Sequence, residues 1–184
     1  MTQDTASSQD TRTTTPGPRP WPRRLLGVVR RIPSTLILVA VILVFGVATQ
    51  ALWTPFAKSP AWDVLAYGLP AFTDGRWWTL VTGSFVSSAP PVYIANLIAL
   101  WGLVWLEYRR GWRVAMAYFW IGQLFAVLAS AMLLWALSFT GSPWAIAQAQ
   151  LLDVGWSGGA FACMAAAVGL FRSPWRVRAW LVLL

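Results

Sequence analysis

Long runs of apolar residues, separated by short polar or charged segments, dominate the sequence after its first 31 residues. Residues 32–57 contain no charged side chain, and residues 114–139 contain none either. A helix that crosses the hydrocarbon of a bilayer needs about 20 mostly apolar residues. The pattern therefore predicts membrane-spanning helices over about 34–55 and 114–139.

Two further runs have the same character. Residues 91–106 follow Pro90, which is tolerated in the first turn of a helix, and they end at a charged cluster. Residues 155–171 are dominated by Gly and Ala and are followed by Arg172. Both runs predict spans, and the apolar residues 179–184 predict an incomplete fifth one. The expected fold class is an all-α, polytopic transmembrane helical bundle with four complete spans and the start of a fifth.

The remaining segments divide the chain into an arm and a membrane domain. Residues 1–33 are rich in Ser, Thr, Pro and Arg and predict a disordered basic cytoplasmic arm. Residues 34–184 then form the transmembrane domain. Between its first two spans, residues 58–91 mix charges with Gly, Pro and Trp, which is typical of a structured interfacial loop.

Composition and charge fit a membrane protein. Hydrophobic residues make up 58% of the chain and charged residues 11%, against roughly 25% charged residues in soluble domains. The net charge of +8 does not indicate nucleic-acid binding, because the cations flank the predicted spans and form no basic domain face. Six Arg precede the first span, three lie between the second and third, and three follow the fourth. This alternation places the N-terminus in the cytoplasm and predicts a multi-pass protein of the cell membrane, the inner membrane in a bacterium.

Two residue types add to this picture. The chain has fourteen Trp, several of them near span ends, where the ring can lie at the headgroup level. We expect Trp156 to be one of these. The single cysteine, Cys163, allows no intramolecular disulfide and no Cys-based metal site. No cofactor or metal is expected, and the expected partner is the lipid bilayer.

The fourth predicted span begins with a motif that has two interpretations. Gly155, Gly158 and Gly159 belong to stripes of small residues, which let helix backbones approach closely. Ser157 lies among them, at the non-cytoplasmic end of the span. It either makes local hydrogen bonds in a packing motif or serves as a nucleophile.

Three elements, in order along the chain, resemble the rhomboid superfamily. The segment Gly75-Arg-Trp-Trp-Thr-Leu-Val-Thr-Gly-Ser-Phe-Val86 is similar to the first loop of the family. Asn96, followed by an apolar helix with Glu107 and Gly111, is similar to its second helix. Gly155-Trp-Ser-Gly158 matches the G-x-S-G element that opens its fourth helix. The resemblance implies a rhomboid-like bundle in which Ser157 is the catalytic serine and Asn96 faces the oxyanion region.

The departures from the family concern its catalytic groups. Val92 stands where the second helix of the family carries a histidine, and Thr79 stands where its loop often has Arg. The chain contains no histidine at all, whereas the rhomboid base is a histidine of the sixth helix. The other candidate bases for Ser157 are Lys58 and Asp153. Lys58 lies in the first loop, and Asp153 needs a raised pKa to act as a base.

These observations favour a rhomboid-like, non-proteolytic membrane module that binds transmembrane helices of other proteins or phospholipid. On this interpretation Asn96 bonds between helices. One alternative is the N-terminal part of an intramembrane serine protease, with Ser157 as nucleophile and its histidine base beyond Leu184. A second alternative is the membrane module of a phospholipid aminoacyltransferase, because the sequence is also similar to rhomboid-like segments of actinobacterial proteins with such a domain.

Overall fold

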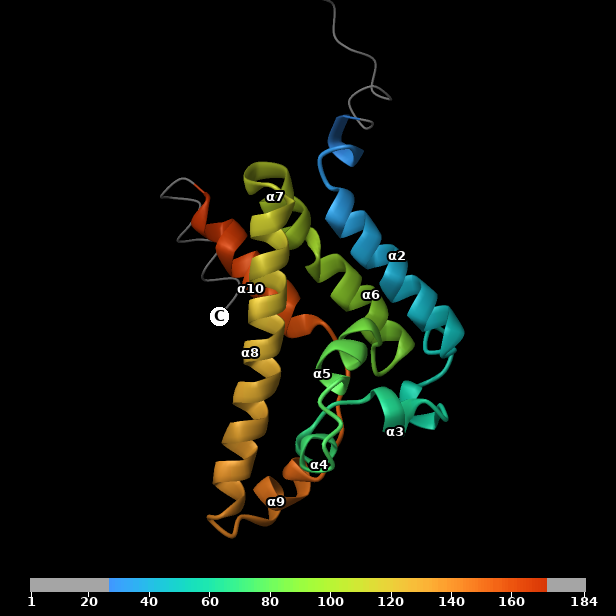
Figure 1. Cartoon of the computed structure of the whole chain (residues 1–184), viewed down its shortest axis with the longest axis vertical. Helices are drawn as coiled ribbons and strands as arrows, with labels where there is room; N and C mark the ends of the chain where they lie inside the picture. Colours follow the sequence, from blue (N-terminus) through green and yellow to red (C-terminus); the bar gives the residue numbers. More distant parts are fainter. Residues whose placement is uncertain (1–26, 172–184) are drawn as a thin grey trace, which may run out of the picture.

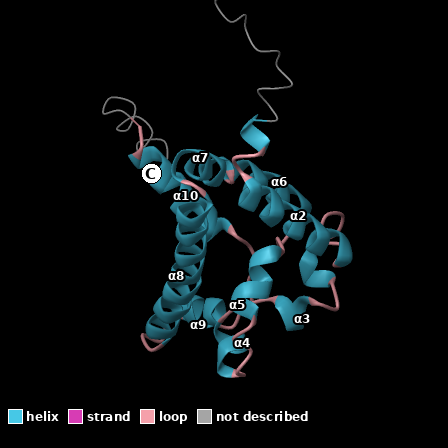
Figure 2. Ribbon diagram, turned by 45° about the horizontal axis from the view of Figure 1, so that its top comes forward, coloured by secondary structure: helices cyan, strands magenta, loops and turns pink. Residues whose placement is uncertain are grey.

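The computed structural model describes residues 27–171, which form helices and connecting turns without a β-strand. This confirms the all-α class for the described part (Figures 1 and 2). The predicted arm before residue 27 and the predicted incomplete span over 179–184 lie outside the described residues. In chain order the elements are α2 (Pro33–Ala48), η1 (Phe56–Lys58), α3 (Trp62–Leu65), α4 (Leu69–Thr73), α5 (Thr79–Thr82), η2 (Gly83–Phe85), α6 (Pro90–Ala99), α7 (Trp101–Arg110), α8 (Trp112–Ser138), α9 (Pro143–Ala149) and α10 (Ser157–Gly169).

Within residues 27–171, two helical segments are long and apolar enough to cross a bilayer. The first, Pro90–Arg110, has 21 residues and consists of α6 and α7, which meet at a turn at Leu100. The second is α8, with 27 residues. At 1.5 Å per residue α8 is about 40 Å long, more than the roughly 30 Å of bilayer hydrocarbon. Pro90–Arg110 includes the span predicted over 91–106, and α8 includes the span predicted over 114–139 except its last residue.

The other two apolar helices are shorter than the spans predicted for them. Helix α2 ends at Ala48 instead of continuing to residue 55. At its end the hydroxyl of Thr49 donates to the carbonyl oxygen of Phe45 at 2.7 Å, and Gln50 has a φ of 58°. A left-handed residue cannot continue a right-handed helix, so the chain turns there. Helix α10 likewise starts at Ser157 rather than at 155.

Helix α10 packs against α8, α7 and α6, while α2 packs against α7 and α8 (Figure 1). The shared core contains Ile42, Leu103, Phe119 and Trp156, all fully buried. Large apolar side chains also lie on the outside of the bundle, which is what a lipid-facing surface requires. These exposed side chains include Ile37, Val44, Ile98, Ile121, Phe125 and Met132.

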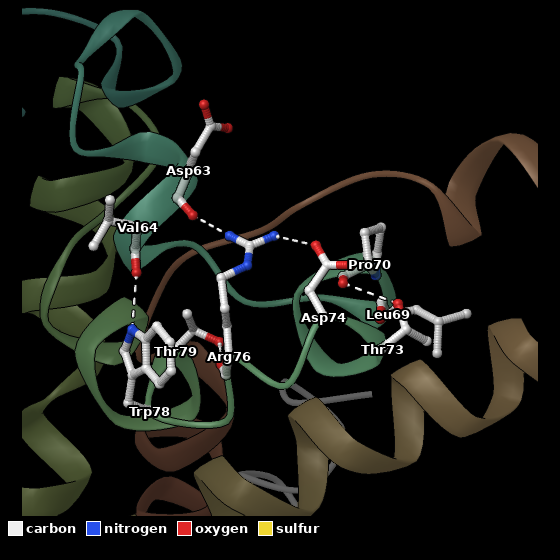
Figure 3. A network of polar contacts seen from close by, with 9 residues as sticks. All are labelled: Asp63, Val64, Leu69, Pro70, Thr73, Asp74, Arg76, Trp78 and Thr79. Atoms are coloured by element: carbon white, nitrogen blue, oxygen red, sulfur yellow. Dashed lines mark hydrogen bonds and ion pairs between the residues drawn. The ribbon is translucent and has the colours of Figure 1, made fainter.

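The chain between η1 and α6, predicted as an interfacial loop, is a series of short helices held by polar contacts (Figure 3). The guanidinium group of Arg76 donates to the carbonyl oxygen of Asp63 and pairs with the carboxylate of Asp74 at 3.1 Å. The indole nitrogen of Trp78 donates to the carbonyl oxygen of Val64 at 3.2 Å. These bonds connect α3 with α4 and α5, so the loop has a defined shape without a long helix.

Glu107 connects the end of α7 to the beginning of α2. Its side chain is buried, and its carboxyl oxygens accept bonds from the backbone N–H of Ser34 at 2.9 Å and of Thr35 at 2.8 Å. The hydroxyl of Thr35 donates a third bond at 2.6 Å. The first N–H groups of a helix have no partner within it, and an acidic group there is favoured by the helix dipole. Glu107 thus caps α2 from another helix.

Replacing Glu107 with Ala should lower the free energy of unfolding by about 2 to 3 kcal/mol, because several buried donors lose a partner. The measurement is reversible unfolding of the purified protein in mixed micelles. Glu107→Gln retains one acceptor oxygen and should lose less. Equal stability of Glu107→Ala and the native protein would contradict this role of the carboxyl group.

Candidate functional site

The backbone at Gly155 determines where α10 begins. Gly155 has a φ of +141°, a conformation that side chains of L-residues rarely adopt. Its N–H donates to the carbonyl oxygen of Gly83 at 3.0 Å. Its own carbonyl oxygen accepts bonds from the amide of Gln123 at 2.6 Å and from the hydroxyl of Tyr67 at 3.1 Å. Both backbone polar groups of Gly155 are therefore bonded although the residue is buried.

Gln123 is the residue that joins these elements. It lies in the middle of α8, is 1% exposed, and uses both ends of its amide. Besides Gly155, its nitrogen donates to the hydroxyl of Ser84 at 3.0 Å, and its oxygen accepts from the N–H of Gly159 at 3.0 Å. Since Gly159 lies in the first turn of α10, Gln123 satisfies one of the donors left free at that helix start.

Tyr67 and Asp153 pair through their backbones. The N–H of Tyr67 donates to the carbonyl oxygen of Asp153 at 2.9 Å, and the reverse bond measures 2.7 Å. Burial raises the pKa of the Tyr67 hydroxyl, and the nearby Asp153 carboxyl raises it further. Partial burial also raises the pKa of the Asp153 carboxyl, although the hydrogen bond from the N–H of Val154 lowers it. The bridge brings the first loop next to the start of α10.

A cavity of about 450 Å³ lies beside this bridge, between α8, α9, α4 and the start of α10. Figure 1 shows α9 and α4 near the end of α8 that is farther from α7. The volume is within the range of small-molecule sites. Its lining combines apolar side chains of α8 with six residues that carry polar groups, namely Tyr67, Gln123, Ser130, Gln148, Asp153 and Ser157.

Ser157, the predicted nucleophile, is the first residue of α10, is exposed, and lines this cavity. Apart from Tyr67, the ionisable residue that shares the cavity with it is Asp153. Among the described residues no hydrogen bond joins the Asp153 carboxyl to the Ser157 hydroxyl; the carboxyl accepts from Val154 at 2.8 Å. Lys58 belongs to η1 and does not line the cavity. The arrangement exposes the hydroxyl but supplies no base in bonding position.

Asn96 lies near Ser157 in space but not in the same cavity. It is half-buried on α6, and its amide nitrogen would lie 3.9 Å from a Cβ built on Gly155. Its carbonyl oxygen accepts a bond from the indole nitrogen of Trp156 at 3.4 Å. Asn96 thus contacts the residues just before Ser157, whereas the cavity is lined from α8, α9 and the first loop.

Trp156 is buried inside the bundle and so does not face lipid headgroups, which corrects the expectation from the sequence. Its side chain is 0% exposed and packs edge-on against Tyr93, with ring centroids 5.3 Å apart. The physical reason is its partners on α6, because its indole nitrogen donates to the backbone carbonyl oxygen of Asn96 and its ring packs on Tyr93. Val92, at the position of the missing family histidine, is exposed on α6.

The three predicted packing glycines occupy different environments. A Cβ at Gly159 would lie 2.7 Å from the carbonyl oxygen of Phe119, and one at Gly158 would lie 2.6 Å from the Cβ of Ala126. Both are close approaches between α10 and α8. Gly155 has space around it and is needed for its positive φ instead.

The sequence interpretation missed Gln123, Ser130 and Gln148. The signal for Gln123 was an amide within an otherwise apolar span, which is costly in lipid unless it has partners. Gln148 lies between the third and fourth predicted spans, and the structure places it on the short helix α9. No pattern in the sequence shows that α9 folds back toward α8.

Within residues 27–171 no three His, Cys, Asp or Glu side chains gather in a way that could hold a metal ion. Comparisons of the chain with protein-family models, with curated proteins and with solved structures find no match. What the fold and site define is a class: a helical protein with two helices able to span a membrane and a partly polar cavity between its helices.

Replacing Gly159 with Leu should destabilise the protein by about 1 to 3 kcal/mol, because the backbone of α8 cannot move aside without cost. Gly169, at the other end of α10, is the matched control, since a Cβ there meets nothing within 4 Å. Thermal unfolding in detergent compares Gly159→Leu with Gly169→Leu. Equal melting temperatures would show that α10 does not pack against α8 in this way.

Proposed function

We propose that the chain is a rhomboid-like, multi-span membrane module that binds lipid or membrane helices through its cavity and does not cleave peptide bonds. The single observation that carries this proposal is the environment of Ser157. Ser157 lines a cavity, but the sequence contains no histidine, and among the described residues no base is hydrogen-bonded to its hydroxyl. A serine without an adjacent base is a weak nucleophile.

A bundle of four spans is compatible with the lengths of α2 and α10. The 16 residues of α2 are about 24 Å long, a deficit that local thinning of the bilayer accommodates. The 13-residue α10 is shorter still and is preceded by extended backbone at Gly155. Such backbone is tolerated at membrane depth only where it is buried in protein or lines a cavity, and Gly155 is buried beside this cavity.

The arrangement of cations supports a cytoplasmic N-terminus for this bundle. Arg31 lies over the ring of Tyr108 at 5.3 Å, and Arg109 lies over Trp105 at 5.4 Å. Glu107 joins the same two helix ends, so these cations gather at one end of the bundle. Positive residues favour the cytoplasmic side, and the cavity then opens toward the opposite side.

The proposal predicts that the purified 184-residue chain is not labelled at Ser157 by fluorophosphonates and does not cleave a transmembrane substrate in liposomes. General-base assistance alone is commonly worth about 10² to 10⁴ in rate. An oxyanion donor of the kind that Val92 cannot supply is worth about 10² to 10³ in a well-studied serine protease. Together the two losses leave activity near background.

The matched control is Ser157→Ala, tested beside the native chain with the same probe and substrate. Both proteins should give the same background signal. Labelling or cleavage by the native chain that disappears in Ser157→Ala would refute the non-proteolytic proposal and favour an intramembrane serine protease.

A further inference from the structure

The cavity beside Ser157 adjoins an apolar groove on the outside of α8. The groove, of about 360 Å³, lies between α4 and α8 and is lined by Leu69, Phe72, Trp77, Leu128 and Trp135 among others. Leu69 and Ala131 line both the cavity and the groove. A partly polar cavity therefore borders an apolar groove, which is the distribution of polarity in a lipid with its headgroup and acyl chain.

The lining of the groove suits part of an acyl chain. Trp77 and Trp135 line it and are both exposed, as expected for rings near the headgroup level. From Trp135 to Leu128 the groove follows α8 for seven residues, about 10 Å along the helix axis. Apart from Thr73, the side chains that line the groove are aliphatic or aromatic, so an alkyl chain there makes mainly apolar contacts.

The cavity has the charge and the acceptors for an ammonium group. Asp153 contributes a carboxyl, and among the described residues no Lys or Arg lines the cavity. The lining residues Ser130, Gln148 and Ser157 add side-chain oxygens, which can accept hydrogen bonds. A primary ammonium donates three such bonds, a quaternary ammonium donates none, and an anionic headgroup would meet the Asp153 carboxyl unfavourably.

We propose that this cavity and groove bind one phospholipid with a primary amine headgroup, such as phosphatidylethanolamine. The ammonium lies beside Asp153, and one acyl chain lies in the groove between α4 and α8. The inference rests on the proposed function, because it names the ligand of the cavity that the proposed module uses.

The test measures lipid adducts by native mass spectrometry of the delipidated 184-residue chain, using phosphatidylethanolamine, phosphatidylcholine and phosphatidylglycerol with identical acyl chains. Phosphatidylethanolamine should be bound about fivefold more than the other two, the ratio expected for one accessible charge pair with its hydrogen bonds. Asp153→Asn should remove this preference. Asp63→Asn, which changes an exposed carboxyl outside the cavity, should leave it intact.

A second pair of variants tests the acyl-chain position. Ala131→Phe fills the junction of cavity and groove and should lower the binding of all three lipids severalfold. Ala136→Phe adds the same ring to an exposed position of α8 that lines neither space and should have no effect. Water-soluble glycerophosphoethanolamine, which has no acyl chain, should not displace the lipid at equal concentration.

Equal binding of the three lipids by the native chain would overturn the inference. An equal loss of the preference for phosphatidylethanolamine in Asp153→Asn and Asp63→Asn would also overturn it. Unchanged binding in Ala131→Phe, or displacement by the soluble headgroup, would overturn it as well. None of these outcomes bears on proteolysis. Labelling of Ser157 by a fluorophosphonate in the same preparation would instead refute the proposed function, so the two failures are distinguishable.

Discussion

The bonds around the Gly155 carbonyl are the constraint on which the site depends. A backbone that leaves helical geometry inside an apolar bundle must have its polar groups satisfied by protein. Gln123 and Tyr67 both donate to this carbonyl, while the N–H of Gly155 donates to Gly83. The first loop, α8 and α10 therefore meet at one residue. Because α10 can begin only after it, Ser157 is exposed to the cavity rather than enclosed in a longer helix.

Apolar length predicted the two longest helical segments well, because an uncharged run such as 114–139 has few ways to bury its backbone other than as a helix. It overestimated α2 and α10, where the boundaries depend on single residues. Gln50, just after α2, has a positive φ that prevents the helix from continuing. Gly155, just before α10, is bonded to distant elements, so that helix begins only after it. Hydropathy does not reveal either helix boundary, because both boundaries depend on backbone conformation and tertiary partners.

The site was predictable only in part for the same reason. Ser157 stood out through its glycine-rich surroundings, and the structure shows it facing a cavity. Gln123 and Gln148 were not singled out, since their importance depends on which helices are neighbours. On the function we propose, the chain is a membrane module in which Ser157 lines the cavity without a base bonded to its hydroxyl. The surrounding polar groups then serve recognition of a lipid headgroup, the role we propose for Asp153.

The central claim is that Ser157 faces a cavity open to water from the non-cytoplasmic side, although it lies within the helical bundle. The most direct measurement is the reaction of Ser157→Cys, in a Cys163→Ala background, with a membrane-impermeant maleimide added to intact cells. The account predicts labelling slower than that of Thr140→Cys in the exposed turn after α8, and no labelling of the native chain at buried Cys163. A Ser157→Cys protein that stays unlabelled while Thr140→Cys reacts would contradict the account.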